Sequence, residues 1–376
     1  MIVSLREYAA QYGKSGDMMR RFAERGTLKT ARKIGRNWVV DSDEPYPVRM
    51  RKEKTSRPRF SVVSLFSGCG GMDLGFLGGF DFLGTHYGKT GFDIVWANEL
   101  DHNACKTYRR NFGDDYLVEG DINEQMDSLP ETADIVIGGF PCQDISINGK
   151  MLGIKGKRSS LYTAIVETVQ RIQPKMFIAE NVGGLLMKKN EYSLNKILDD
   201  FNSLGYNISY QLYNAADYGV PQTRERIFIV GTRSDVAAFC PPKPLNSEPI
   251  TARMALNDLE NCEWNPDIAQ IWSKAKVSGE QGNRKLVADR PGYTIRSECH
   301  GNIQFHYSLP RRISMREAAR LQSFPDDFVF PCGLRATERQ IGNAVPPVLA
   351  WMMAMAASKA LLEVHDEKKR VREAVG

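Results

Sequence analysis

Between residues 60 and 182 the sequence alternates apolar runs with helical segments, and no other feature constrains the fold as strongly. The apolar runs predict buried strands at 61–66, 92–97, 134–137 and 175–179. Helices are expected between them, including 103–111 and 160–172. Strands that alternate with helices form a parallel sheet with right-handed crossovers, so the sequence predicts an α/β fold.

Polar or glycine-rich residues follow the predicted strands. Ser67-Gly-Cys-Gly-Gly71 follows the first, Asn98-Glu99 the second and Glu180-Asn181 the last, while Gly120-Asp121-Ile122 ends a shorter element. Parallel sheets bind ligands at the carboxyl ends of their strands, so these segments are expected to line one site. Glu99 lies where a carboxylate can accept hydrogen bonds from both hydroxyls of a ribose. The turn is not Gly-x-Gly-x-x-Gly, so these residues alone select no single cofactor.

Cys142 lies in the hexapeptide Gly-Gly-Phe-Pro-Cys-Gln at 138–143, directly behind the strand at 134–137. Pro141 fixes its own φ and pushes Phe140 toward extended geometry, so the turn is stiff. A structural cysteine is the commoner explanation for such a hexapeptide alone. The neighbouring polar strand ends favour a nucleophile instead. Arg224 and Arg226 belong either to a surface ion-pair strand or to this site.

The basic charge of the chain is concentrated at its N-terminus. Residues 1–60 contain 15 Lys and Arg against 7 Asp and Glu, a net of +8, which leaves 35 against 38, a net of −3, for the remainder. A capping box at Ser4-x-x-Glu7, two short helices and a hairpin across 31–40 predict a winged helix-turn-helix at 1–44. It resembles MerR and excisionase DNA-binding modules; a structural or protein-docking role is the alternative. Residues 45–59 are expected to be a linker.

The seven cysteines are scattered and never spaced Cys-x-x-Cys, which argues against a disulfide framework and against a zinc site. The N-terminus lacks a signal peptide's apolar core, and no run reaches the roughly 18 apolar residues of a membrane span. These features predict a cytoplasmic protein that does not bind a membrane and holds no metal.

Seven motifs occur in one order along the chain, and together they identify a family resemblance. They are Phe-Ser-Gly-Cys-Gly-Gly (66–71), Asn-Glu (98–99), Gly-Asp-Ile (120–122), Gly-Phe-Pro-Cys-Gln (139–143), Glu-Asn-Val (180–182), Gln-Thr-Arg-Glu-Arg (222–226) and Gln-Ile-Gly-Asn-Ala-Val-Pro-Pro (340–347). The chain resembles the DNA (cytosine-5) methyltransferases of bacterial restriction–modification systems over roughly residues 60–365, apart from much of 234–290.

The resemblance implies a domain organisation. A Rossmann-like, S-adenosylmethionine-dependent methyltransferase domain with a mostly parallel sheet is expected at 60–233. A smaller, variable target-recognition domain is expected at 234–310. Residues 311–365 would return to the catalytic domain, and 366–376 would form a polar tail.

The resemblance also implies a reaction. Cys142 would add to C6 of a cytosine flipped out of double-stranded DNA, which makes C5 nucleophilic enough to accept a methyl group. Glu180 would hydrogen-bond or protonate N3, which requires a raised pKa. Arg226 would donate to O2, and Arg224 would lower the pKa of the thiol.

S-adenosylmethionine is assigned to the strand ends by the same resemblance. The residues implied are Phe66, Gly68, Gly71, Glu99, Asp121, Ile122, Asn343 and Val345. An ordinary helix cap before Ala344 is the alternative for Asn343.

DNA contacts are expected from two segments. Gln143 and a glycine-containing loop at 146–158, with Lys150, Lys157 and Arg158, would close over the duplex. In the recognition segment Arg296, Gln304 and His306 supply groups suited to base edges. The chain is expected to act as a monomer on DNA, with a restriction endonuclease that shares its site without touching it. The alternatives are a cytosine-5 RNA methyltransferase and a transcriptional autoregulator that acts through residues 1–44.

Overall fold

The computed structural model describes residues 2–11, 19–20, 23, 28–34, 37–42, 44, 59–140, 161–275, 284–297 and 304–375, with side chains to 363. The chain divides into two compact units, Met1–Arg57 and Pro58–Gly376. Each unit is described by itself. The predicted linker, apart from Arg59, and the hexapeptide's Cys142 lie outside the described residues.

The N-terminal unit contains helix α1 (Leu5–Gln11) and a small antiparallel sheet in the order β1-β3-β2. Its strands are β1 (Ile2–Ser4), β2 (Arg32–Ile34) and β3 (Asn37–Asp41). The capping box is confirmed, because Ser4 N donates to Glu7 Oε2 at 2.8 Å and Glu7 N donates to Ser4 Oγ at 3.2 Å. The hairpin is confirmed too, whereas β1 was not predicted. Most of the predicted second helix lies outside the described residues, so the helix-turn-helix stays a prediction.

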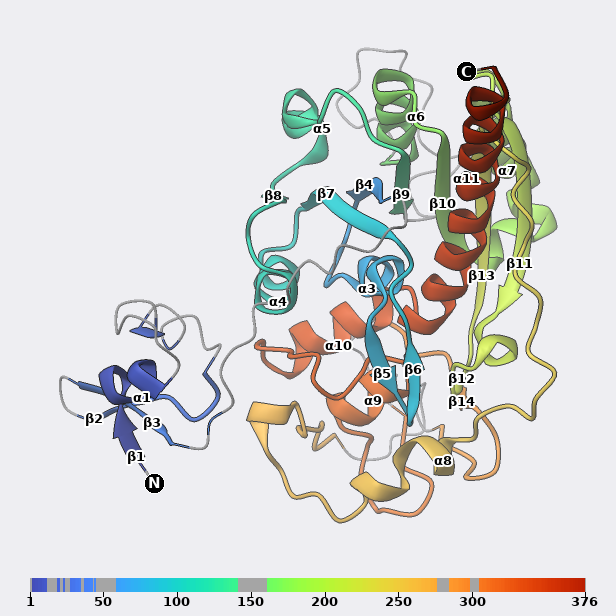
Figure 1. Cartoon of the computed structure of the whole chain (residues 1–376). Helices are drawn as coiled ribbons and strands as arrows, with labels where there is room; N and C mark the ends of the chain where they lie inside the picture. The colour runs from blue at the N-terminus through green and yellow to red at the C-terminus, as the bar shows by residue number, and fades with distance from the viewer. Residues whose placement is uncertain are drawn as a thin grey trace. The chain divides into compact units, whose positions relative to one another are not determined.

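The second unit is built on a seven-stranded sheet in the order β11-β13-β10-β9-β4-β7-β8 (Figure 1). Five neighbouring strands are parallel, and β13 runs antiparallel to both of its neighbours, β10 and the edge strand β11, which confirms a mostly parallel sheet. The strands are β4 (Phe60–Leu65), β7 (Phe92–Glu99), β8 (Leu117–Glu119), β9 (Ile135–Gly139), β10 (Met176–Val182), β11 (Asn207–Asn214) and β13 (Glu225–Thr232). A separate hairpin joins β5 (Phe80–Phe82) to β6 (Thr85–Tyr87).

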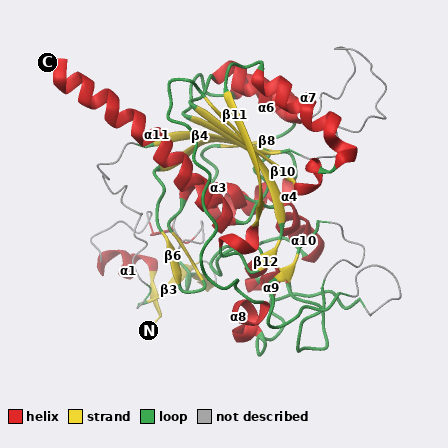
Figure 2. Ribbon diagram, turned by 90° about the vertical axis from the view of Figure 1, so that its right-hand side faces the viewer, coloured by secondary structure: helices red, strands yellow, loops and turns green. Residues whose placement is uncertain are grey.

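Helices cover both faces of this sheet (Figure 2). One core contains side chains of α3 (Gly71–Leu77), α4 (His102–Phe112) and α11 (Pro347–Val375). The other contains side chains of α5 (Ile122–Gln125), α6 (Leu161–Ile172) and α7 (Glu191–Asn202). Neighbouring strand residues divide between the cores, as Val62 and Val63 do, because side chains alternate along a strand.

The apolar run at 344–362 predicts a long C-terminal helix, and the observed helix differs from that prediction at both ends. It begins at Pro347 rather than Ala344, because proline suits the first helical turn, where its missing N–H costs nothing. It continues to Val375, so most of the predicted polar tail is helical. Among the described residues, Leu334–Glu363 is long and apolar enough to cross a membrane. However, 67% of its apolar window is buried inside the protein, as in a core helix.

A third core lies beneath the predicted recognition segment. It joins Leu286 and Ile295, which lie before residue 310, to Ile313, Met315 and other residues after it. The elements around it are β12 (Gln222–Thr223), α8 (Ala252–Leu256), β14 (Gly292–Tyr293), α9 (Met315–Leu321) and α10 (Leu334–Asn343). The predicted boundary at 310 therefore passes through one continuous core.

Candidate active site

The end of β9 is held firmly where the chain approaches Cys142. Phe140 N donates to Glu180 O at 3.2 Å, and Asn181 Nδ2 donates to Phe140 O at 2.9 Å. Phe140 is thus fixed through both its N–H and its carbonyl by β10. Asn181 was not among the predicted site residues, although its place in Glu-Asn-Val was the available signal. Two residues of chain advance at most about 7 Å, so the two hydrogen bonds of Phe140 restrict where Cys142 can lie.

Glu180 and Arg226 form a buried ion pair beside that strand end. Arg226 Nε lies 2.7 Å from Glu180 Oε1, and the two side chains are only 11% and 10% exposed. The pair meets because β13 runs antiparallel to β10, which places Arg226 at the start of its strand beside the end of the other. Burial raises the pKa of Glu180, against the opposing effect of the Arg226 and Arg224 guanidiniums. A carboxyl of this kind can hold a proton for a substrate atom.

Gly139 provides the space that the other Glu180 oxygen occupies. A Cβ atom on Gly139 would lie 2.8 Å from Glu180 Oε2. The carboxyl of Glu180 can therefore lie where it does because residue 139 has no side chain.

Replacing Gly139 with alanine should lower the methyl-transfer rate about 10- to 100-fold, because a displacement of about 1 Å at a reacting group has costs of that order. Cofactor affinity and melting temperature should change little. The measurement is single-turnover methylation of duplex DNA. Gly184→Ala is the matched control, since its Cβ would meet only Val182 Cγ2 at 3.9 Å. Equal methyl-transfer rates for the two variants would contradict the proposal that the position of the Glu180 carboxyl controls the rate.

Arg224 is fully buried and binds main-chain carbonyls. Its Nη1 donates to Ile295 O at 2.8 Å, and its Nη2 donates to Gly342 O at 2.7 Å and to Ala344 O at 3.1 Å. These contacts join segments about a hundred residues apart in the sequence. Its predicted action on the Cys142 thiol stays a prediction.

The glycine-rich turn and Glu99 meet at the carboxyl ends of β4 and β7. Gly68 N donates to Glu99 Oε2 at 2.7 Å, while Leu100 N and Asp101 N donate to Glu99 Oε1 at 2.9 and 2.7 Å. Burial raises the pKa of Glu99, and these hydrogen bonds oppose the shift. A carboxylate has about four acceptor positions, so the structure leaves about one for a ligand hydroxyl, fewer than the predicted two.

Open space adjoins this turn, as a ligand site requires. Gly68 has a φ of +57°, and a Cβ built on it would meet no atom within 4 Å. Phe66 before it also has a positive φ, 54°, and packs partly buried against the sheet core. Leu100 is 68% exposed beside Glu99, and sequence reasoning missed it. A partly buried carboxyl, a bare glycine backbone and an exposed apolar side chain fit a nucleoside-containing cofactor.

The remaining predicted cofactor residues lie at neighbouring ends. Asp121 is exposed and caps α5 by accepting from Asn123 N at 3.0 Å, while Ile122 is 2% exposed in the core. Val345 reaches the glycine-rich turn, since a Cβ on Gly71 would lie 2.6 Å from Val345 O. Asn343 is exposed and ends α10, which agrees with the alternative of an ordinary helix end.

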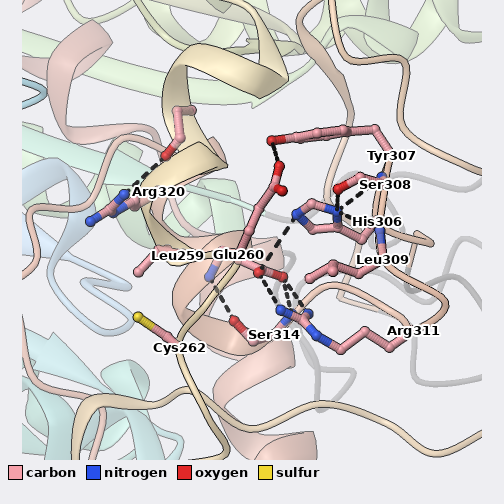
Figure 3. A network of polar contacts seen from close by, with 12 residues as sticks. Leu259, Glu260, Cys262, His306, Tyr307, Ser308, Leu309, Arg311, Ser314 and Arg320 are labelled. Carbon is pink, nitrogen blue, oxygen red and sulfur yellow. Dashed lines mark hydrogen bonds and ion pairs between the residues drawn. The ribbon is translucent and has the colours of Figure 1, made fainter.

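The predicted recognition residues separate into exposed and buried groups. Arg296 is exposed, whereas Gln304 is 3% exposed and donates through Nε2 to Tyr293 O at 2.9 Å. His306 is fully buried, which corrects the expectation that it reaches a base edge. Its Nδ1 accepts from Ser308 N at 3.2 Å, so the ring is neutral with its proton on Nε2 (Figure 3). Burial lowers the pKa of His306 and supports this state.

The same network fixes α9 beneath the recognition segment (Figure 3). Arg311 donates two hydrogen bonds to Glu317, at 2.8 and 2.7 Å, and Glu317 also completes a capping box with Ser314. Gln143, Lys150, Lys157 and Arg158 lie outside the described residues.

Replacing Glu99 with alanine should raise the Kd for S-adenosylhomocysteine about 10- to 100-fold, because a hydrogen bond to a charged group contributes about 1.5–3 kcal/mol. Isothermal calorimetry measures the change. Glu119→Ala is the matched control at the next strand end, where the carboxylate instead pairs with Arg109 Nη1 at 2.6 Å. A similar loss in both variants would indicate general damage to this edge and not a cofactor contact.

The chain is similar to known proteins over most of its length. Residues 60–285 and 267–359 match the family model for C-5 cytosine-specific DNA methylase. Type II methyltransferase M.NgoFVII of Neisseria gonorrhoeae is 38% identical over an alignment 323 positions long that covers 76% of this chain and 83% of that protein. Type II methyltransferase M.Eco47II of Escherichia coli is 30% identical over an alignment 417 positions long that covers 97% of this chain and 96% of that protein.

A solved structure shares the fold. It is the crystal structure of a prophage-encoded protein of E. coli described as a candidate DNA modification methyltransferase, with a TM-score of 0.60 and 23% sequence identity. The match covers 81% of this chain and 99% of that one.

Proposed function

The chain belongs to the C-5 cytosine-specific DNA methylase family, and from this premise we propose that it methylates cytosine in double-stranded DNA through a transient bond between Cys142 Sγ and C6. The family is S-adenosylmethionine-dependent, and DNA is its substrate. The observation that carries the proposal is the buried Glu180–Arg226 pair beside Gly139, which ends the strand that leads to Cys142.

The proposed reaction begins with addition of the thiolate to C6. The electrons of the C5–C6 double bond move toward N3 and O2, where protonated Glu180 donates to N3 and Arg226 donates to O2. The ring becomes an enamine whose C5 is nucleophilic. Removal of the C5 proton, by water or another base, later restores the double bond and releases the cysteine sulfur. The raised pKa of Glu180 suits proton donation to N3, and the fixed positive charge of Arg226 suits hydrogen bonding to O2.

S-adenosylmethionine, when bound, supplies the electrophilic methyl group that C5 takes. We assign it to the open space at Gly68, with Glu99 accepting from the ribose and Leu100 offering an apolar surface for the adenine. Phe66, Ile122 and Val345 would close the apolar side of the site. Asp121 and Asn343 would lie at its exposed rim.

The cytosine must leave the base stack to reach this site, because C6 is covered in a duplex. We propose that Gln143, Lys150, Lys157 and Arg158 contact DNA around the flipped base and that Arg296 reads a base edge. Gln304 forms a buried hydrogen bond instead, and we propose no DNA contact for it.

The biological role we propose is protection of host DNA in a restriction–modification system, since the relatives are type II methyltransferases. The enzyme would act in the cytoplasm as a monomer on DNA. A restriction endonuclease would recognise the same sequence without binding the methyltransferase.

Bisulfite sequencing of DNA from cells that express the protein tests this function. We expect methylated cytosines in one short sequence context. Purified protein should also transfer labelled methyl groups to duplex DNA and not to transfer RNA. Preference for transfer RNA would replace the proposed substrate with the RNA alternative.

A further inference from the structure

We propose that Gln222 and Arg224 are positioning residues that determine the sequence specificity of methylation by clamping the main chain of Ile295. The inference rests on the proposed function and deepens it. It names the device that connects base recognition to the catalytic strand, and it gives Arg224 a task different from action on the thiol.

The clamp binds Ile295 through both its main-chain N–H and its main-chain carbonyl. Ile295 N donates to Gln222 Oε1 at 2.9 Å, and Ile295 O accepts from Arg224 Nη1 at 2.8 Å. Gln222 and Arg224 are each 0% exposed, and the Ile295 side chain is 7% exposed in the third core. Water cannot replace such contacts easily, because an unpaired polar group in this interior costs free energy. The main chain at Ile295 is therefore fixed.

The residue that follows the clamp is the exposed Arg296. A guanidinium on a flexible stem discriminates between base edges only when its backbone is accurately placed. The clamp supplies that placement from the buried side. Gly342 also packs directly on the peptide after Arg296, since a Cβ there would lie 2.4 Å from both Arg296 C and Ser297 N.

The chain segment that bears the clamp also bears part of the catalytic pair, since β12 (Gln222–Thr223) leads through Arg224 into β13 (Glu225–Thr232). β12 runs parallel to β14, with Gln222 beside Gly292 and Thr223 beside Tyr293. Two residues beyond Arg224, Arg226 pairs with Glu180. Five consecutive residues, 222–226, thus connect the position of Arg296 to the position of the catalytic carboxyl. A displacement of the recognition segment at Ile295 would therefore be transmitted through residues 222–226 to Arg226.

Further contacts hold the clamp itself. Gln222 Nε2 donates to Leu321 O at 3.0 Å, and Gln322 Nε2 also binds the Ala344 carbonyl that Arg224 contacts. The clamp is therefore attached to both α9 and the junction between α10 and α11, and it does not move independently of them.

Gln222→Ala and Arg224→Lys test the proposal by bisulfite sequencing of DNA methylated in cells by each full-length variant. Alanine removes the acceptor for Ile295 N, and lysine lacks the planar fork that reaches carbonyls in two segments. We expect methylation to spread to sites that differ from the cognate sequence at one base pair. The ratio of cognate to one-mismatch methylation should fall about 10-fold, the order of one base contact.

Thr223→Ala is the matched control, because Thr223 lies between the two clamp residues but its side chain is exposed. Its methylation context should match wild type. A uniform loss of methylation in the clamp variants, with the context unchanged, would overturn the proposal and leave Gln222 and Arg224 a structural role only. A wild-type protein that methylates no defined context would instead refute the proposed function.

Two further variants keep the test decisive if a clamp variant folds poorly by thermal melting. Gly342→Ala should relax the same base position, since it displaces the Arg296–Ser297 peptide without removing a polar group of the clamp. Arg296→Ala should relax that position alone, and adding Gln222→Ala to it should relax the context no further. Additional relaxation in the double variant would show that the clamp does not act through Arg296.

Discussion

Replacing Cys142 with serine will abolish methyl transfer, with a rate at least about 10⁴-fold below wild type, while S-adenosylhomocysteine still binds. A hydroxyl ionises far less readily than a thiol at neutral pH, so it cannot add to C6 at a useful rate. Loss of a covalent nucleophile has effects of this order in other enzymes. Steady-state transfer of labelled methyl groups to duplex DNA measures the loss.

The other cysteines provide the control for this substitution. Cys240 is exposed, so Cys240→Ser should retain wild-type activity. Duplex DNA containing 5-fluorocytosine at the target should trap the wild-type protein, because fluorine blocks the proton loss that releases the sulfur. Wild-type activity in Cys142→Ser, or a crosslink that survives this substitution, would exclude the covalent scheme.

Glu180→Gln should slow formation of the Cys142–C6 bond by about 10²- to 10⁴-fold, the range for loss of a general acid. Glutamine keeps the shape of glutamate and an oxygen for Arg226 Nε, but it has no acidic proton for N3. Because burial raises the pKa of Glu180, its protonated fraction persists above the ordinary carboxyl range and then falls as pH rises through the raised pKa. The wild-type addition rate should therefore decline at high pH, and this decline should be absent from the variant.

Rapid-quench measurement of the DNA adduct between pH 5 and 9 checks this result. Glu338→Gln is the control, since Glu338 is also buried and its pKa is raised to about 7 by desolvation. Glu338 lies on α10, and among the described residues it forms no hydrogen bond or ion pair with Glu180 or Arg226, so the adduct rate of this variant should match wild type. An unchanged adduct rate in Glu180→Gln would remove Glu180 from the proton transfer.

Much of the fold could be predicted because apolar periodicity is a local property of the chain. The strand predicted at 92–97 is β7 (Phe92–Glu99), and the helix expected at 103–111 is α4 (His102–Phe112). The short strands β1, β5 and β6 were missed, because a three-residue strand carries too little periodicity. The shared core across residue 310 depends on contacts between distant segments, which no local pattern records.

The candidate site also has a part that sequence motifs could predict and a part that they could not. Motif order could place Glu180, Arg226 and Glu99 at strand ends, and the structure puts each of them at one. The partners of Arg224 could not be predicted, since they are main-chain carbonyls 71, 118 and 120 residues away that any residue type can supply. The burial of His306 could not be predicted either, because the sequence does not distinguish a histidine that contacts a base edge from one that binds a turn.

The third core has a consequence for building chimeric enzymes from relatives. A graft of residues 234–310 alone would carry Ile295 and Leu286 but leave behind Ile313 and Met315, against which they pack. New junctions placed before α8 and after α10 would transfer the buried residues of that core apart from Cys69. Gln222 and Arg224 lie outside the graft and would still have to match the incoming backbone at Ile295, so a change of target preference should also require adjustment at these two residues.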